Sequence, residues 1–352
     1  MHNKNHIIYK TKFYTFIIVF GFLLPSLIFS AGGNETWGQT AGSPVTYPIY
    51  PPGALKDLPP GYTLIEGDIQ VRISALEERR ITGVFATNFW TNGIIPFEFD
   101  TNVTPADQAA MLTAMADWEN VANVQFLART NESDYVHIQD STANNSAVGM
   151  QGGQQIINIF NWNSEFIMAH ELGHCLALWH EHNRPNRDTY ITINTSNIQA
   201  DFRNQFDKNS SAGEYWKYNY DFDSVMHYDQ CAFSINCAAG FTCPCTSTVI
   251  TVLAPNQAWQ TLIGQRAHLS TLDSLTMSFL YPETNWRFAD GSYTGSSENG
   301  GFLTPYKHVS AGIAGTPAGG TLWIQPNNYP ETGTYTNSIT IRAPLGEVVI
   351  GN

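Results

Sequence analysis

The stretch His170-Glu171-Leu172-Gly173-His174, followed by His180-Glu181, brings three histidines and two carboxylates close together in the chain. An α-helix has 3.6 residues per turn, so His170 and His174 project from adjacent turns of one helix face. Both imidazoles can reach one tetrahedral ion. On a continued helix, His180 would point roughly 240° away from His174, so the chain must bend to bring it back. Such a bend usually takes a glycine, because one residue adopts the left-handed conformation.

Three neutral histidines leave a zinc ion with its full charge and one open position for water. The ion lowers the pKa of that water, and Glu171 can take its proton as a general base. We therefore predict one catalytic Zn²⁺ held by His170, His174 and His180. Two alternatives stay open: the histidines are merely structural, or a distant glutamate replaces His180 as the third ligand.

The composition limits the classes of function. The chain has 352 residues, enough for a sizeable core and for more than one domain. Acidic residues outnumber basic ones by 30 to 17, giving a formal net charge of −13. This excess argues against nucleic acid or an anionic membrane as the main partner.

The N-terminus has the plan of a secretory signal peptide. Three lysines precede an apolar run from Phe13 to Phe29, which Pro25 interrupts, and small residues follow from Ser30. We expect residues 1–30 to be a signal peptide and the mature protein to be secreted. The alternative is an uncleaved anchor, because the run approaches the length of a membrane span. No later stretch is apolar enough to span a bilayer, so no integral span is expected after cleavage.

The cysteines suggest a disulfide-bonded loop. Four of them lie within a short segment, at Cys231, Cys237, Cys243 and Cys245. In an exported protein such a cluster usually forms disulfides, here with three possible pairings. A second metal site is the alternative, although the C-x-C spacing does not favour it. Cys175 is left over and is expected to be a buried, small apolar residue.

Changes in composition divide the chain into four parts. Residues 31–80 are first rich in glycine and proline, then more regular, and end in Arg79-Arg80. We predict that they form a propeptide with a processing site at the arginines, although an exposed turn would have the same sequence. Residues 81–283 are the predicted catalytic domain. Residues 284–352 are predicted to be a separate β-rich region with the spacing of one or two β-solenoid coils.

Within the catalytic domain, apolar patterns and helix caps predict an α+β fold. Strands are expected at 93–99, 124–127, 135–139 and 156–160. Helices are expected after Thr104-Pro105, after a cap at Asn163 or Ser164, and after Ser270. The helix after Thr104 places Met111, Met115 and Trp118 at helical spacing, so it should pack on the core.

Several segments together resemble the astacin metallopeptidases, a branch of the metzincins. The residues from His170 to Asp188 resemble the extended zinc motif of that family, and Ser224-Val225-Met226-His227-Tyr228 resembles its Met-turn. Segments at 90–96, 149–154 and 263–273 also fit, so the resemblance covers about residues 85–282. It implies a metzincin-like domain, with a twisted mixed sheet and the active-site helix above an irregular lower half. It also implies a monomeric zinc endopeptidase that binds protein or peptide substrates in an extended conformation.

The resemblance assigns further roles. Met226 would form a hydrophobic floor under the zinc, and Tyr228 would be an additional ligand that can also stabilise the oxyanion. Asp68, in Leu64-Ile65-Glu66-Gly67-Asp68, would occupy the water position and keep a zymogen inactive. A simple Gly-Asp turn is the alternative, but the position before a dibasic pair and the catalytic domain favours the inhibitory role. An activating protease would cut after Arg80. The new N-terminus would then be buried near Glu181, which gives that residue a structural role.

The sequence departs from the family in two places. Ala177 stands where the bend glycine is usual, and a left-handed alanine costs roughly 1–2 kcal/mol. The usual disulfide cysteines are absent, and the cluster from Cys231 to Cys245 follows the Met-turn instead. The competing hypothesis is a catalytically weak surface-binding protein that acts through its C-terminal β region. The presence of all the catalytic groups weighs against it.

Overall fold

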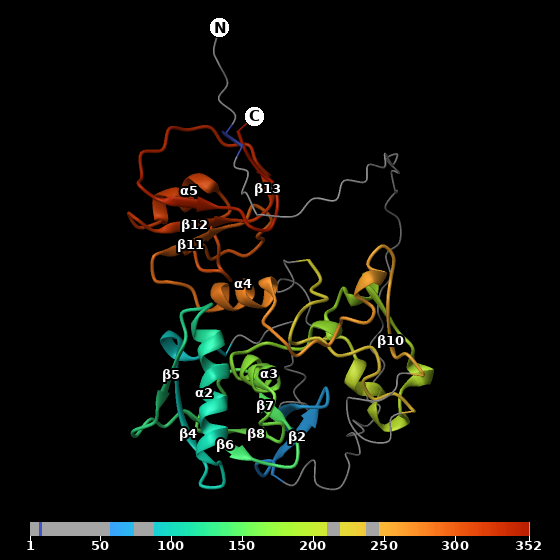
Figure 1. Cartoon of the computed structure of the whole chain (residues 1–352). Helices are drawn as coiled ribbons and strands as arrows, with labels where there is room; N and C mark the ends of the chain where they lie inside the picture. The colour runs from blue at the N-terminus through green and yellow to red at the C-terminus, as the bar shows by residue number, and fades with distance from the viewer. Residues whose placement is uncertain (1–6, 9–56, 74–87, 210–218, 237–245, 352) are drawn as a thin grey trace. The chain divides into compact units, whose positions relative to one another are not determined.

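The computed structural model describes residues 7–8, 57–73, 88–209, 219–236 and 246–351. The chain forms two compact units, one spanning Pro48–Thr284 and the other containing the residues from Asn285 onward (Figure 1). Most of the predicted signal peptide, the Arg79-Arg80 site and three cysteines (Cys237, Cys243 and Cys245) lie outside the described residues. Within the described ranges, no helix has the length and apolar character needed to cross a membrane.

The larger unit is built on a seven-stranded mixed sheet with the order β2-β3-β7-β8-β6-β4-β5. The pairs β2–β3 and β7–β8 are antiparallel and the other neighbours are parallel. The strands are β2 (Tyr62–Ile65), β3 (Ile69–Arg72), β4 (Ile94–Phe99), β5 (Gln125–Ala128), β6 (Tyr135–Asp140), β7 (Asn145–Ala147) and β8 (Gln154–Ile159).

The first two strands come from the predicted propeptide, whose described part, residues 57–73, is called the prosegment below. β3 pairs in parallel with β7, with Ile69 opposite Ser146. The prosegment therefore extends the sheet at the β7 edge and is part of the unit that it precedes in sequence.

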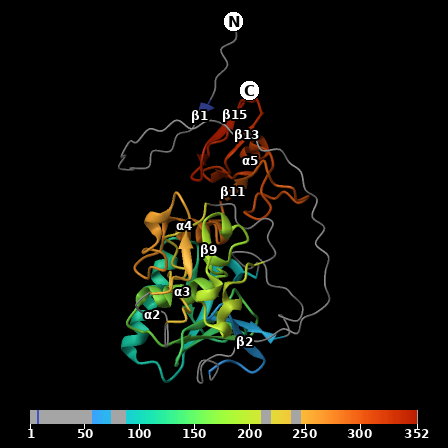
Figure 2. The same cartoon turned by 90° about the vertical axis from the view of Figure 1, so that its right-hand side faces the viewer.

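Two helices, α2 (Pro105–Glu119) and α3 (Glu165–Cys175), pack against each other and against the sheet (Figures 1 and 2). The predicted start of α2 is confirmed, because the Thr104 side chain accepts a hydrogen bond from the Asp107 N–H. The predicted core position of Trp118 is also confirmed: it is fully buried, and its indole N–H donates to the Ala169 carbonyl at 2.9 Å. This bond ties α2 to the helix that carries the histidines.

The chain after α3 is irregular, as the resemblance implies. It consists mainly of loops and short 3-10 helices, η2 (Glu181–Asn183), η3 (Arg187–Thr189), η4 (Thr195–Asn197), η5 (Ala200–Phe206) and η6 (Gln257–Trp259). Strands β9 (Ile191–Ile193) and β10 (Ile250–Val252) form an antiparallel pair. Helix α4 (Thr271–Leu280) closes the unit, and Ser270 and Asp273 form a capping box at its start.

The described residues of the second unit form two small sheets and one helix. Its elements are β1 (Ile7–Ile8), β11 (Trp286–Ala289), α5 (Val309–Gly315), β12 (Thr321–Ile324), β13 (Asn327–Tyr329), β14 (Thr340–Arg342) and β15 (Val348–Ile350). β12 pairs in parallel with β14, and β13 pairs in parallel with β15. The segment with β12 and β13 therefore lies beside the later segment with β14 and β15. The sequence did not predict helix α5.

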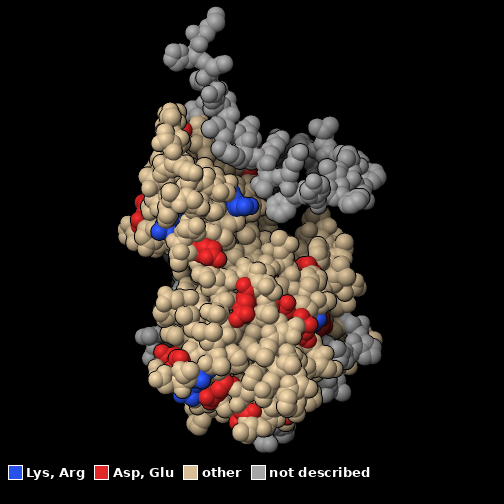
Figure 3. All heavy atoms as spheres, turned by 60° about the vertical axis from the view of Figure 1, so that its left-hand side comes forward, with Lys and Arg blue, Asp and Glu red and all other residues tan. Residues whose placement is uncertain are grey.

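The α+β prediction is confirmed for the larger unit, where the expected strands and helices form to within a few residues of the predicted bounds. Short elements without a clear pattern, such as β7 and the 3-10 turn η1 (Thr91–Gly93), were not predicted. The acidic excess of the composition appears on the face drawn in Figure 3, where Asp and Glu side chains are scattered among few basic ones.

Candidate metal centre

Helix α3 carries His170 and His174, and it ends immediately after them. The Leu178 N–H donates to the Gly173 carbonyl at 2.9 Å, and the Ala177 N–H donates to the His174 carbonyl at 2.7 Å. These two bonds form a Schellman motif, which requires a left-handed residue at Ala177. Ala177 has a φ of 89°, so the predicted strained bend is confirmed.

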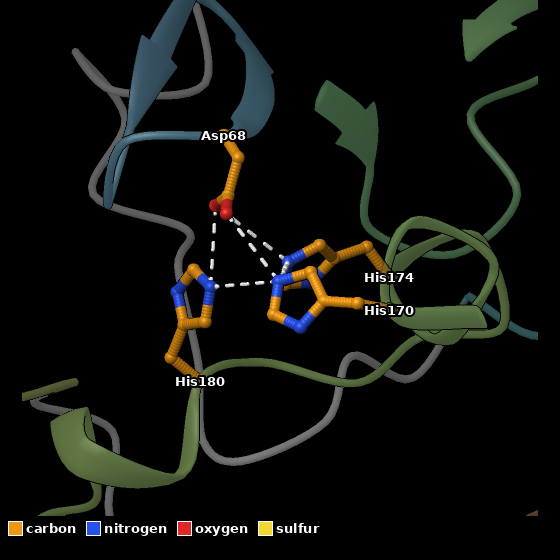
Figure 4. Close-up of side chains that lie close together, drawn as sticks. All are labelled: Asp68, His170, His174 and His180. Atoms are coloured by element: carbon orange, nitrogen blue, oxygen red, sulfur yellow. Dashed lines mark hydrogen bonds and ion pairs between the residues drawn. The ribbon is translucent and has the colours of Figure 1, made fainter. Parts of the chain in front are cut away.

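The bend returns the chain so that His180 faces the other two histidines (Figure 4). The Nε2 atoms of His170 and His174 lie 3.1 Å apart, and those of His170 and His180 lie 3.3 Å apart. Asp68, from the turn between β2 and β3, points at the same position. Its carboxylate oxygens lie 3.3, 3.7 and 3.2 Å from the Nε2 atoms of His170, His174 and His180.

The ring tautomers indicate what this position can hold. His170 Nδ1 contacts the Val225 carbonyl at 2.7 Å, and His174 Nδ1 contacts the Leu178 carbonyl at 2.8 Å. A carbonyl only accepts, so each Nδ1 carries the proton and, in a neutral ring, each Nε2 carries a lone pair. Lone pairs that face one another this closely repel unless a cation lies between them.

A zinc ion fits that requirement. Ligands about 2.0–2.1 Å from a tetrahedral ion lie about 3.3 Å from one another, close to the nitrogen separations found here. Among the described residues, Asp68, His170, His174 and His180 offer ligand atoms that all lie within 4.8 Å of one another, and all four are buried. This group can hold one metal ion.

The charges in the site depend on one another. Burial alone would raise the pKa of Asp68. The positive charge of His180 and the close contacts with the three histidine rings outweigh burial and hold this pKa well below its usual range. Asp68 is therefore ionised, as a ligand for a cation must be.

Glu171 lies on α3 between the two helical histidines and is also buried. Its Oε2 has no hydrogen-bond partner among the described residues. Burial, together with the charge of Asp68, raises the pKa of Glu171 well above its usual range. A buried carboxylate with an unused oxygen beside a metal position can exchange a proton with a small molecule bound there.

The structure places Met226 beneath the histidine helix. A Cβ atom built on Gly173 would lie 2.8 Å from the Met226 sulfur, so the close contact depends on glycine at this position in α3. The Tyr228 hydroxyl donates to the main-chain carbonyl of Glu66 in the prosegment. Its ring centroid lies 4.6 Å from that of His180.

Glu181, next to His180, forms a buried ion pair with Arg184 at 2.6 Å. The same Oε1 atom accepts the Asp221 N–H at 2.8 Å. Ile81, the residue expected to approach Glu181 after processing, lies outside the described residues. Cys175 is buried with a free thiol, as predicted, and burial raises its pKa to about 12. Cys231 is buried, and pairing within its cluster stays a prediction.

Sequence reasoning missed several residues that support the site. Glu66 Oε2 lies 2.8 Å from His180 Nδ1, and Gln205 Oε1 accepts the Gly67 N–H at 2.7 Å. Asp273 accepts the Val225 N–H at 2.8 Å and so fixes the segment that binds His170. Of these, only Asp273 had a sequence signal, since Ser270 three residues earlier makes a capping pattern.

Comparison with known proteins agrees with this geometry. Residues 84–282 match the model of the peptidase family described as Astacin. Zinc metalloproteinase nas-6 of Caenorhabditis elegans is 33% identical over 217 residues, covering 60% of this chain and 57% of that protein. Tolloid-like protein 2 of Homo sapiens is 36% identical over 214 residues, covering 58% of this chain and 20% of that protein.

Among solved structures, the chain is similar to high choriolytic enzyme 1, a hatching enzyme zinc-protease from Oryzias latipes. That similarity has a TM-score of 0.48 at 32% sequence identity, and covers 55% of this chain and 94% of that one. In the sequence comparisons, this chain spans 57% of the length of the nematode relative and 20% of the length of the human one. Since the family match extends over more than half of the sequence, the chain belongs to the astacin family of peptidases.

Proposed function

We propose that this protein is a secreted zinc endopeptidase, made as a latent precursor. The observation that carries the proposal is the convergence of three histidine Nε2 atoms beside a buried glutamate that has an unused oxygen. The family supports the same chemistry, and the nematode relative is named a zinc metalloproteinase. Secretion is supported by the signal-peptide pattern at residues 1–30.

His170, His174 and His180 would hold the zinc ion. When bound, zinc supplies a Lewis acid that polarises a carbonyl and lowers the pKa of water. Glu171 then acts as the general base: its carboxylate takes the proton from the attacking water and passes it to the leaving amine. Burial favours this role, because it brings the pKa of Glu171 closer to that of the groups with which it exchanges protons.

Tyr228 and Met226 would have supporting roles. The Tyr228 hydroxyl donates to a prosegment carbonyl here, and after the prosegment leaves the same O–H is available to the metal or to the oxyanion of the substrate. Met226 would give the histidine helix an apolar floor. Glu181 would organise the lower half, first through Arg184 and then, after processing, near the new N-terminus.

Latency would come from Asp68. Its carboxylate lies 3.2–3.7 Å from the three Nε2 atoms and would block the position that the water and the substrate carbonyl need. The next residues form β3, whose pairing with β7 would keep the carboxylate there. An activating protease would cut near Arg80 and permit the prosegment to leave. Asp68 would therefore be a ligand of the precursor only.

The test is metal analysis and peptide-library cleavage on the full chain before and after a cut near Arg80. We expect zinc in both forms, at about one ion per chain, and hydrolysis only after the cut. Glu171→Ala should keep zinc and lose about 10²–10⁴-fold in rate. Asp68→Asn should weaken latency in the uncut form. Hydrolysis by Glu171→Ala at the wild-type rate would rule out Glu171 as the base. Full activity of the uncut wild type would rule out inhibition by Asp68.

A further inference from the structure

The three histidines differ in what holds their second ring nitrogen. For His170 and His174 the partners are the carbonyls of Val225 and Leu178, which both belong to the region matched by the family. For His180 the partner is the Glu66 carboxylate at 2.8 Å. Within the described part of the chain, no other group binds that nitrogen. Two ligands are therefore oriented by the catalytic region itself, and the third is oriented by the prosegment.

His180 is also the ligand with the least support from its own backbone. It follows the strained bend at Ala177 and has an extended backbone with φ −68° and ψ 135°. The helix fixes the other two histidines, because they belong to successive turns of α3. An outer hydrogen bond fixes the tautomer and orientation of a metal-binding histidine and raises its basicity. Of the three ligands, His180 should therefore depend most on such a hydrogen bond for its orientation.

Glu66 is held in place by several contacts. Its φ of 50° is left-handed, and its carbonyl accepts the Tyr228 O–H. The next residue, Gly67, donates its N–H to the fully buried Gln205 at 2.7 Å. A buried carboxylate is costly unless it is paired, and His180 is the ion-pair partner that the described residues provide.

We propose that Glu66 is a positioning residue of the metal centre, through which the prosegment orients His180 and tightens zinc binding in the precursor. This inference rests on the proposed function for the zinc ion and the cut, and it adds a second role for the prosegment. Asp68 closes the position where substrate binds, whereas Glu66 acts on a ligand from the opposite side of its ring. The precursor then binds zinc more tightly than the same chain without its prosegment.

The test measures the Zn²⁺ dissociation constant of the full uncut chain by competition with a chromophoric chelator. Glu66→Ala should weaken zinc binding about 10- to 100-fold, the usual cost of losing an outer partner of a ligand. Glu66→Gln keeps a neutral acceptor of about half the strength, so it should weaken binding about 3- to 10-fold. Asp57→Asn is the matched control, because Asp57 is a prosegment carboxylate that accepts from the Ser141 hydroxyl at 2.7 Å and has no hydrogen bond or ion pair to a histidine among the described residues.

The cut and removal of the prosegment take Glu66 away from the wild type, so the wild type should then bind zinc more weakly than the uncut chain does. Wild-type zinc affinity in uncut Glu66→Ala would overturn the proposal, and so would a wild type that binds zinc equally well before and after its prosegment is removed. If Glu66→Ala does not fold, Glu66→Gln decides, and an unchanged dissociation constant in that variant overturns it.

Failure of the proposed function would give different results. A wild-type chain that binds no zinc, or a cut wild type that hydrolyses no peptide, would contradict the peptidase itself. If the wild type is a zinc peptidase but its zinc affinity does not depend on Glu66, only the present inference is contradicted.

Discussion

Ala177→Gly tests the bend that brings His180 to the metal position. Ala177 is fully buried and has a φ of 89°. Glycine removes the left-handed strain, which costs about 1–2 kcal/mol. It also removes a buried methyl group worth about 0.8 kcal/mol and adds freedom to the unfolded chain worth about 0.4–1 kcal/mol. These terms nearly cancel, so the free energy of unfolding should change by less than about 1 kcal/mol.

Ala114→Gly is the matched control. Ala114 is also fully buried, but it lies in the regular helix α2. Glycine in a helix costs about 1 kcal/mol relative to alanine, and the lost methyl adds about 0.8 kcal/mol. This variant should therefore be about 2 kcal/mol less stable than the wild type. The two substitutions delete the same atoms, so their difference isolates the strain at Ala177.

The assay is urea unfolding of the full chain with saturating zinc, followed by tryptophan fluorescence. Ala177→Gly should be about 1–2 kcal/mol more stable than Ala114→Gly and should bind zinc like the wild type. Equal destabilisation by the two variants would show that Ala177 carries no strain and would refute the reasoning.

Three further predictions concern the support of the site. Asp273→Ala removes the acceptor for the Ser224 hydroxyl at 2.6 Å and for the Val225 N–H at 2.8 Å, so thermal unfolding should show a loss of about 2–4 kcal/mol. Burial, then the charges of Asp273 and Glu181, raise the pKa of Asp221 to about 8. The stabilising contribution of protonated Asp221 is complete below its unfolded pKa of about 3.9 and is lost as pH rises through about 8. Asp221→Asn should therefore flatten the fall in the free energy of unfolding between about pH 4 and 8, measured by urea titration at each pH. An unchanged dependence of that free energy on pH would contradict this. Finally, zinc at about 1,000 times its dissociation constant should raise the stability of the metal-free chain by about 4 kcal/mol, and His170→Ala should abolish most of that gain in calorimetry.

Local patterns predicted the parts of the site that are close in sequence. The spacing of His170 and His174 requires only helical geometry, and Thr104 and Ser270 mark helix starts through their own side chains. The bend at Ala177 followed from the need to return His180 to the same ion. In each case the residues that determine the structure lie within a few positions of one another.

The contacts that complete the site are distant in sequence. Glu66 meets His180 across 114 residues, and Gly67 meets Gln205 across 138. No spacing rule connects such pairs, because the turn between β2 and β3 reaches the histidines only after β3 joins the sheet at β7. β7 itself is three residues long, fully buried and without alternation, so its sequence resembles a loop.

The way the prosegment is held has a kinetic consequence. A cut near Arg80 breaks a peptide bond but leaves the β3–β7 pairing and the bond from the Ser146 N–H to the Asp68 carbonyl at 2.9 Å unchanged. If the prosegment inhibits as proposed, cleavage and release would be separate steps, and the released segment could rebind as an inhibitor. On the proposed function, activity should lag behind cleavage and rise on dilution. Activation would therefore depend on enzyme concentration as well as on the activating protease.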